Sequence, residues 1–452
     1  MKTNARLIEG NVANTLIKLT LQMMMGIVAM VAFNLADTFF VGQLGTAQLA
    51  AISFTFPVVM VVGSISMGLG VGASAVISRA IGAGNQEKVI RLTTDALILA
   101  FVIVSLFAFT GLATIEPLFR AIGATDRLLP HIKSYMTIWY LGVPFVVIPM
   151  VGNNAIRATG DTKTPSMIMM MAVAVNIVMD PLLIFGIGPF PRMELAGAAL
   201  ATVFGRAMTF LFSFWILLKR EKMISFKLPP FKSMVESWRN ILYIGIPAAG
   251  TNLITPISMA VITRLVATFG AEAVAAFGVA TRVEMFALTI LMALGSVVTP
   301  FVGQNQGAEK FDRIRMGVRY SQMFSLGWGV FLFGLFLVGA GAIAAVFNDQ
   351  AEVVAITTRY LRFISLSYGL QGVLMLSSSA LNALRKPLVS AFLAILRMVV
   401  LYVPLAMVGA RLFQVYGIFY AGFLANMIAG VAAYFLLRKE LAAAPPEQSR
   451  KM

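Results

Sequence analysis

Apolar runs of about twenty residues follow one another along almost the whole chain, and each is long enough to cross a lipid bilayer. The composition agrees, because 59% of the 452 residues are hydrophobic and only 12% are charged. The runs do not alternate as barrel strands do, and backbone groups in a bilayer must be satisfied within their own segment, so the runs predict helices. The predicted spans are residues 14–36, 50–77, 92–115, 132–154, 164–187, 194–217, 239–263, 274–300, 316–346, 358–381, 388–409 and 415–437.

The chain also contains an internal repeat. Residues 45–88 recur at 270–313 without insertion or deletion, at a shift of 270 − 45 = 225 residues. Six spans lie in each copy, so both copies enter the membrane in the same orientation and their pseudo-symmetry axis runs along the membrane normal. Such a repeat in an apolar chain is typical of membrane transporters. We therefore expect an all-α integral membrane protein with twelve transmembrane helices in two pseudo-symmetric six-helix bundles.

Hydrophilic segments set the predicted domain limits. The N-terminal bundle is predicted at residues 1–218 and the C-terminal bundle at 239–440. A basic linker at 219–238, with an amphipathic end, is expected to lie along the cytoplasmic membrane surface. The polar tail 441–452 is also predicted to be cytoplasmic.

The formal net charge of +16 could indicate a nucleic-acid-binding protein, but the positions of the basic residues argue otherwise. Lys and Arg concentrate at every second junction between spans, as in residues 79–91, 157–163 and 219–239. This is the positive-inside pattern, so both termini are predicted to be cytoplasmic in a multi-pass protein of the plasma (inner) membrane. The charge orients the chain, and we expect no nucleic-acid partner.

Several classes of chemistry are excluded by the residues that the chain lacks. There is no cysteine, so disulfides, thiolate catalysis and Cys-ligated metals are ruled out. The sequence also contains no phosphate-binding Gly-x-x-x-x-Gly-Lys-Ser/Thr loop and no nucleophile–base constellation. We expect a protein that is not an enzyme and that uses no cofactor other than a coupling ion.

Acidic residues within the spans are costly and are therefore the first candidates for function. Asp37 lies at the outer end of the first span and Asp180 in the fifth, where Asn176 is one helical turn away on the same face. Pro181 frees a backbone carbonyl near Asp180, and Thr202 offers a hydroxyl from the sixth span. Such oxygens can replace the hydration shell of Na⁺, or two close carboxylates can share a proton. The remaining alternative is that each Asp only stabilises helix packing.

The repeat predicts where this ion site lies. At the repeat shift Asp37 corresponds to Ile262, and Asp180-Pro181 aligns with Val403-Pro404 at a shift of 223. The proline is kept in both copies, whereas the carboxylates occur only in the first. We expect an ion site confined to the N-terminal half.

Three further residues are candidates for a substrate cavity. Met171 belongs to a methionine cluster whose flexible side chains either contact lipid or the core, or can repack around varied ligands. Glu284, in the eighth span, could contact a cationic substrate, or it could take part in an interhelical ion pair. Arg282 is two residues away and does not face Glu284 on a helix.

Two motifs resemble those of the multidrug and toxic compound extrusion (MATE) family, and the resemblance covers nearly the whole chain. Arg157–Pro165 looks like the family's loop after the fourth helix, and Asn176–Gly186 looks like its fifth-helix motif. The two carboxylates look most like the DinF-like branch. The resemblance implies a cation site of Asp37, Asn176, Asp180 and Thr202, able to hold H⁺ or Na⁺, and two bundles around a central cavity.

The chain departs from the family pattern in two places. Its first proline is Pro57, so the first span has no proline at which to bend, and bending of that helix as the coupling step is left open. The seventh span carries no acidic residue, so we expect no second ion site there.

The leading hypothesis is a secondary active multidrug efflux transporter that exports amphipathic or cationic organic compounds by antiport with H⁺ or Na⁺. Its expected partners are small-molecule drugs or toxic metabolites and the lipid bilayer, and two fused halves suffice as a monomer. The alternative is a flippase for lipids or lipid-linked oligosaccharides, which would favour a strongly cationic cavity.

Overall fold

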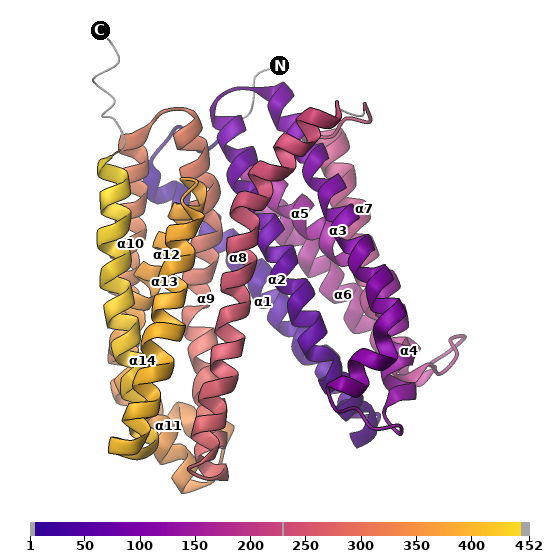
Figure 1. Cartoon of the computed structure of the whole chain (residues 1–452), viewed down its shortest axis with the longest axis vertical. Helices are drawn as coiled ribbons and strands as arrows, with labels where there is room; N and C mark the ends of the chain where they lie inside the picture. Colours follow the sequence, from indigo (N-terminus) through magenta and orange to yellow (C-terminus); the bar gives the residue numbers. More distant parts are fainter. Residues whose placement is uncertain (1–4, 228–229, 444–452) are drawn as a thin grey trace. The chain divides into compact units, whose positions relative to one another are not determined.

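The computed structural model describes residues 5–227 and 230–443, which are almost entirely helical (Figure 1). Residues 1–4, two linker residues (Leu228 and Pro229) and residues 444–452, which form most of the predicted tail, lie outside the described residues. The α-helices are α1 Val12–Gly42, α2 Thr46–Gly82, α3 Gln86–Ala121, α4 Leu129–Gly142, α5 Pro144–Ala158, α6 Lys163–Phe185, α7 Glu194–Trp215, α8 Phe231–Ala267, α9 Ala271–Gly307, α10 Phe311–Phe347, α11 Ala351–Ile364, α12 Tyr368–Ala383, α13 Pro387–Ile395 and α14 Val403–Ala442. The π-helical turns η1 Ile216–Arg220 and η3 Leu396–Tyr402 and the 3₁₀ turn η2 Ser365–Ser367 connect or extend them.

The number of membrane spans agrees with the sequence. Ten helical segments in the described part are long and apolar enough to cross a membrane, and the bent pair α4–α5 adds an eleventh. The last of the ten covers 56 residues and contains two predicted spans. Its backbone leaves helical geometry at Phe413 and Gln414, where Gln414 has a φ of 53°. Counted as two spans, this segment brings the total to 11 + 1 = 12, and the predicted fold class is confirmed.

The fourth span is not the single helix that its apolar run suggests. α4 and α5 are bent by 40° between Gly142 and Pro144. Proline has no amide hydrogen and clashes with the carbonyl of the preceding turn, so it is well suited to the first position of a new helix and poorly suited to a helix interior. The composition of the run predicts the span, and Pro144 determines where it bends.

Contacts divide the described chain into two compact units. Unit 1 contains residues 21–246, and unit 2 contains residues 6–20 and those from 247 onward. The units thus differ from the predicted bundles 1–218 and 239–440, because two helices change unit along their length: α1 at Leu21 and α8 at Pro247. Since 247 − 21 = 226, the two changes lie within one residue of the repeat shift of 225.

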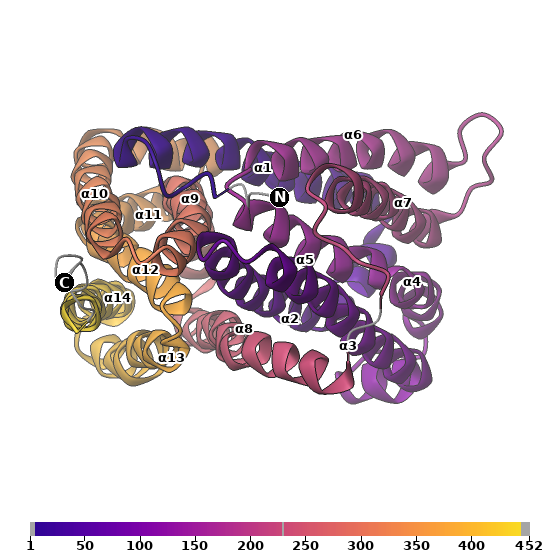
Figure 2. The same cartoon turned by 90° about the horizontal axis from the view of Figure 1, so that it is seen from above.

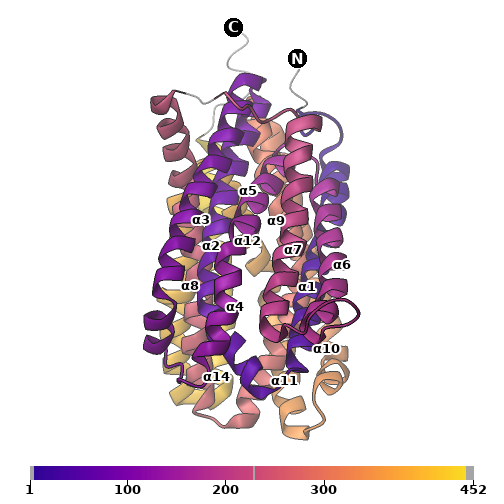
Figure 3. The ribbon, with the colours of Figure 1, turned by 90° about the vertical axis from the view of Figure 1, so that its right-hand side faces the viewer.

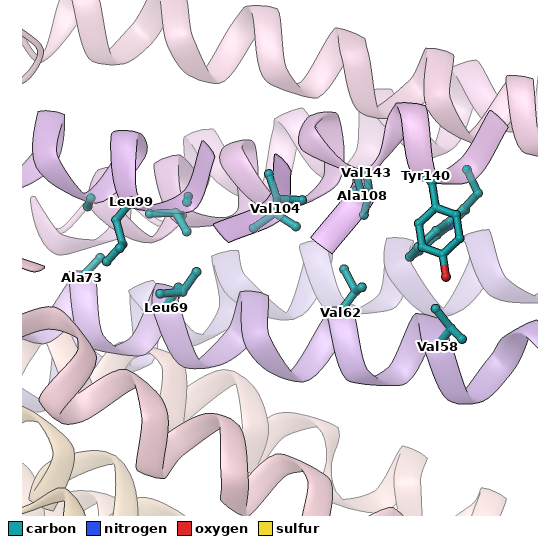
Figure 4. Packing of buried hydrophobic residues seen from close by; sticks show 14 of the residues in the cluster. Val58, Val62, Leu69, Ala73, Leu99, Val104, Ala108, Tyr140 and Val143 are labelled. Atoms are coloured by element: carbon teal, nitrogen blue, oxygen red, sulfur yellow. The ribbon is translucent and has the colours of Figure 1, made fainter. Parts of the chain in front are cut away.

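The core of unit 1 is built around α2 and α3 (Figure 4). The buried residues Val58, Val62, Leu69 and Ala73 of α2 are spaced by four, seven and four residues, which places them on one face of the helix. Lipid is as apolar as these side chains, so close packing rather than the hydrophobic effect holds such helices together in a bilayer.

The start of α8 packs within unit 1. Trp238 donates its indole N–H to the backbone carbonyl of Asp95 in α3 at 2.9 Å. A Cβ added at Gly72 in α2 would lie 2.4 Å from the carbonyl oxygen of Ile241, so the two backbones approach closely there. The amphipathic end of the predicted linker is therefore the first part of a helix anchored on α2 and α3.

The segment before α1 has an equivalent anchor in unit 2. The buried Leu7 donates its amide to Gln304 at 3.0 Å and accepts from Asn305 at 3.1 Å. Lys310 donates to the carbonyl of Ile8 at 2.9 Å. The Arg313 guanidinium donates to the same carbonyl of Leu7 at 3.3 Å and to two further ones, those of Glu9 at 3.0 Å and Gly10 at 2.8 Å.

Arg313→Ala is expected to release the segment before α1, because a charged donor to three carbonyls is lost. Hydrogen exchange of the amides in residues 6–11 should become about tenfold faster, since hydrogen bonds to charged groups are worth about 1.5–3 kcal/mol each. The matched control is Arg319→Ala, since Arg319 is an exposed arginine of the same helix. If the amides of this segment are equally protected from exchange in both variants, Arg313 does not anchor the segment.

Gly197→Ala is expected to destabilise unit 1, because its Cβ would lie 2.4 Å from the carbonyl oxygen of Leu183. Backbone cannot move aside as a flexible side chain can, and overpacking costs about 1–3 kcal/mol. The control is Gly327→Ala in α10, which has nothing within 4 Å and gains helix propensity. Thermal unfolding in detergent should show a lower Tm for the first variant and an equal or higher Tm for the second.

Candidate functional site: a carboxylate centre in unit 1

The centre of the site is a pair of buried polar side chains on α6. Asn176 and Asp180 are both 0% exposed, and the Asn176 side-chain amide donates to Asp180 Oδ1 at 3.1 Å. Asp180 Oδ2 and Asn176 Oδ1 have no hydrogen-bond partner within residues 5–227 and 230–443. Buried acceptors are almost always satisfied in proteins, so this pair is a place where a proton or a cation would be held.

Pro181 follows directly within the helix. α6 continues through it to Phe185. Because proline has no amide hydrogen, the carbonyl of Ile177 lacks its usual partner in the helix. This adds a backbone oxygen acceptor one turn from Asp180, as predicted from the sequence.

The segment Arg157–Pro165 joins the beginning of α6 to the interior of α1. Thr162 donates to the side-chain oxygen of Gln22 at 2.9 Å, and a Cβ added at Gly26 would lie 2.9 Å from the Ser166 hydroxyl. At 1.5 Å per residue, Asp180 lies about 27 Å beyond Thr162 along α6 and Asp37 about 22 Å beyond Gln22 along α1. The contact between Thr162 and Gln22 thus places Asp180 and Asp37 at similar distances along their two helices.

Asp37 completes the carboxylate pair. Its charge and that of Asp180 interact, and both act on the phenol of Tyr135 in α4. Asp37 also lines a cavity of about 340 Å³ within unit 1. The other lining residues, from α1 and α2, are Val41, Leu49, Ile52, Ser53 and Phe56.

Tyr135 is a further residue of the site, and it was not predicted because the prediction rested on acidic side chains. Its side chain is 8% exposed, and it comes from α4, which the sequence did not connect with the site. The internal repeat could have indicated Tyr135, because a shift of 225 residues aligns Ser134-Tyr135 with Arg359-Tyr360.

Thr202 lies near the site but makes no direct bond to it. α7 packs alongside α6 (Figures 2 and 3), and a Cβ added at Gly205 would lie 3.7 Å from Asn176 Cβ. In the described part of the chain no hydrogen bond joins Thr202 to Asn176 or Asp180. The role of Thr202 stays a prediction.

Unit 2 contains a separate carboxylate network. Glu284 accepts hydrogen bonds from the Tyr360 hydroxyl at 2.7 Å and from the Gln371 amide at 3.1 Å. Asn426 extends the network, since it donates to Gln371 at 3.1 Å. Glu284 is thus held by neutral donors, while Arg282 is exposed. Tyr360 is the repeat equivalent of Tyr135, so the same position of the repeat holds a buried tyrosine in both units.

Met171 is half-buried on α6, close in sequence to Asn176. Its role and those of Arg282 and Glu284 at a substrate cavity stay predictions. Three or more His, Cys, Asp or Glu side chains do not gather as a metal site anywhere in the described chain. A Na⁺ site in unit 1 would therefore combine Asp37 or Asp180 with neutral oxygens such as that of Asn176, and such hard oxygens suit Na⁺.

The loop before α6 carries its own ionic cluster. Thr164 donates its amide and hydroxyl to Asp161 at 2.9 and 2.6 Å, and Arg220 makes a close ion pair with the same carboxylate. Partial burial alone would raise the pKa of Asp161, but the Thr164 hydrogen bonds and the Arg220 charge outweigh it and hold this pKa below its ordinary value of 3.8. The cluster joins the start of α6 to the end of η1.

A duplicated arrangement of twelve apolar spans with a buried carboxylate, Asp180, inside one of them is typical of a multi-pass membrane transporter. The MatE family model matches residues 23–182 and 247–408, one match in each copy of the repeat. The chain belongs to this family, the MATE transporters. The family suggested by the two sequence motifs is confirmed, and the DinF-like branch stays a prediction.

Relatives cover nearly the whole chain. The FAD transporter of Shewanella oneidensis is 38% identical over 97% of both chains. The probable multidrug resistance protein YoeA of Bacillus subtilis is 28% identical over 75% of this chain and 74% of its own. Among solved structures, the Vibrio cholerae MATE transporter VcmN has a TM-score of 0.90 at 30% identity, covering 96% of this chain and 97% of that one.

Asp161→Asn tests the loop cluster through its pH dependence. A carboxylate with a depressed pKa stabilises the folded protein above its unfolded pKa and loses this contribution as the pH falls through and below about 3.9. The variant should therefore have a lower Tm than wild type at pH 7, and the difference should shrink below pH 4. Asp349→Asn, at an exposed carboxylate, should show no such difference; a constant Asp161→Asn effect across this range would contradict the ionic role.

Proposed function

We propose that this MATE transporter exports organic compounds by antiport, and that H⁺ or Na⁺ binds at Asp37, Asn176 and Asp180 to drive it. The observation that carries the proposal is the pair of unsatisfied buried acceptors, Asp180 Oδ2 and Asn176 Oδ1. An uncompensated acceptor of this kind is costly in a low-dielectric interior, and binding a proton or a cation removes the cost.

The site has the properties that ion coupling requires. Two carboxylates that feel each other's charge repel when both are ionised, and a bound ion relieves this repulsion. The ion therefore stabilises the conformation in which the carboxylates face each other. A substrate that stabilises the other conformation is displaced by the ion, which is the thermodynamic basis of antiport.

Ion gradients suffice to drive export. A proton gradient of one pH unit supplies about 1.4 kcal/mol per proton, and a potential of 100 mV supplies about 2.3 kcal/mol per charge. Together these correspond to a concentration ratio of several hundredfold for an uncharged substrate. In this proposal the protein works as a monomer in the plasma (inner) membrane with both termini in the cytoplasm.

Two substrate classes are candidates. Amphipathic or cationic drugs fit the sequence analysis and the name of the 28% identical Bacillus subtilis relative. FAD is the second candidate, because the relative of that name is 38% identical and covers 97% of this chain. The names of both relatives favour export of a soluble organic compound over the flipping of lipids or lipid-linked oligosaccharides.

Asp180→Asn is expected to uncouple transport. In proteoliposomes loaded with ethidium or FAD, wild type should show efflux against a concentration gradient when a pH gradient or a Na⁺ gradient is imposed separately. The rate of this driven efflux should fall at least about tenfold in the variant, because a neutral amide carries no charge with which to bind and release the coupling ion. The gradient that drives wild type identifies the coupling ion.

Two controls separate coupling from misfolding. Asp126→Asn changes an exposed carboxylate, which is 82% exposed, and should leave driven efflux intact. Exchange of substrate against substrate without an ion gradient should persist in Asp180→Asn. Driven efflux at the wild-type rate in Asp180→Asn would contradict the proposed ion site. Absence of efflux from wild type under both gradients would contradict the proposed function.

A further inference from the structure

One face of α7 carries a guanidinium and two aromatic rings in register. Arg206, Phe210 and Phe214 are four residues apart, so they follow one another along the same side of the helix. Phe33 from α1 lies at the Arg206 end, with the guanidinium carbon 5.2 Å from the centre of its ring. We name this group, with Phe145 and Phe226, the α7 ladder.

Arg206 has no ion-pair partner among the described residues, since none of their ion pairs includes it. A guanidinium stays protonated in proteins, and placing one in a membrane span is expensive unless it is paired or functional. The Phe33 ring offsets part of this cost by a cation–π contact and leaves the N–H groups of the fork without an acidic acceptor.

The aromatic part of the ladder is continuous within unit 1. The rings of Phe145 and Phe210 meet edge to face, with centroids 5.7 Å apart. Phe210 and Phe214 stack at 5.8 Å with an interplanar angle of 23°, and Phe214 contacts Phe226 at 6.5 Å. These spacings are those of favourable aromatic pairs.

The ladder is distinct from the outward face of the same helix. Phe204, Leu211 and Trp215 are 51%, 59% and 56% exposed, as expected of side chains that contact lipid. The opposite side is buried, where Ser213 donates to Asn153 at 3.1 Å. Arg206, Phe210 and Phe214 are half-buried, so they are neither core residues nor simple lipid contacts.

We propose that the α7 ladder is a substrate track for a planar aromatic compound that carries phosphate, with FAD as the candidate, and that Arg206 is its specificity-determining residue. Flat rings stack on phenylalanine without requiring particular hydrogen bonds. The free edge of a stacked guanidinium binds phosphate oxygens in a bidentate manner, which lysine cannot do. This inference rests on the proposed export function and names its substrate class.

The charge of Arg206 separates substrate classes. A phosphate-bearing compound supplies the acceptor that the guanidinium lacks, whereas a cation such as ethidium can stack on the rings but is repelled by Arg206. Riboflavin carries the same flavin ring without the phosphates. These three compounds therefore report separately on stacking and on charge.

The experiment measures transport of FAD, riboflavin and ethidium in proteoliposomes containing wild type, Arg206→Gln, Arg206→Lys, Phe210→Leu and the control Phe204→Leu on the exposed face. Arg206→Gln should lower the ratio of FAD to ethidium transport about tenfold or more, with Arg206→Lys in between. Riboflavin transport should respond to Phe210→Leu and not to Arg206→Gln. Phe204→Leu should leave all ratios at their wild-type values.

The outcomes distinguish the inference from the function on which it rests. If wild type moves ethidium but not FAD, the substrate class is overturned and the export function stands. If Arg206→Gln lowers transport of all three compounds equally, Arg206 is a structural residue and the specificity role is overturned. If wild type moves none of the three under any gradient, both the proposed function and the inference fail.

Discussion

The close packing of α6 against α7 is the interaction on which the carboxylate site depends. Helices in a bilayer gain nothing from hiding apolar surface, so they associate where backbones can approach closely. Gly197 and Gly205 provide this approach, because added Cβ atoms would lie 2.4 and 3.0 Å from the carbonyl oxygens of Leu183 and Ala172. Asn176 and Asp180 lie at this contact and are completely buried. Because they are buried, their unsatisfied oxygens cost free energy that a bound proton or cation removes.

Much of this arrangement could be predicted because membrane spans are recorded in the sequence as long apolar runs. The twelve spans, the duplication and the Asn176–Asp180 pair follow from composition and spacing alone, since residues four apart share a helix face. Two backbone features were less visible. The bend before Pro144 and the break at Gln414 depend on a local dihedral choice that an averaged apolar run does not reveal.

Contacts between distant helices were the other limit. Tyr135 is uncharged and ordinary in its own span, so only the fold shows that it is buried within range of the charges of Asp37 and Asp180. The Glu284 network likewise needs Gln371 and Asn426 from two other helices, and no spacing along one helix predicts this. The carboxylates at the positions of Asp37 and Asp180 occur in one copy of the repeat, whereas the aligned tyrosines Tyr135 and Tyr360 occur in both, and Tyr360 donates to Glu284.

The division of α1 and α8 between the units bears on how such a chain arose. Each copy of the repeat contributes the beginning of its first helix to the unit formed mainly by the other copy. A single unfused copy would therefore leave its own anchor sites vacant and its first turns without a place to pack. Having both copies in one chain replaces an encounter between two molecules by a covalent connection, so each copy always finds the partner that its first helix needs.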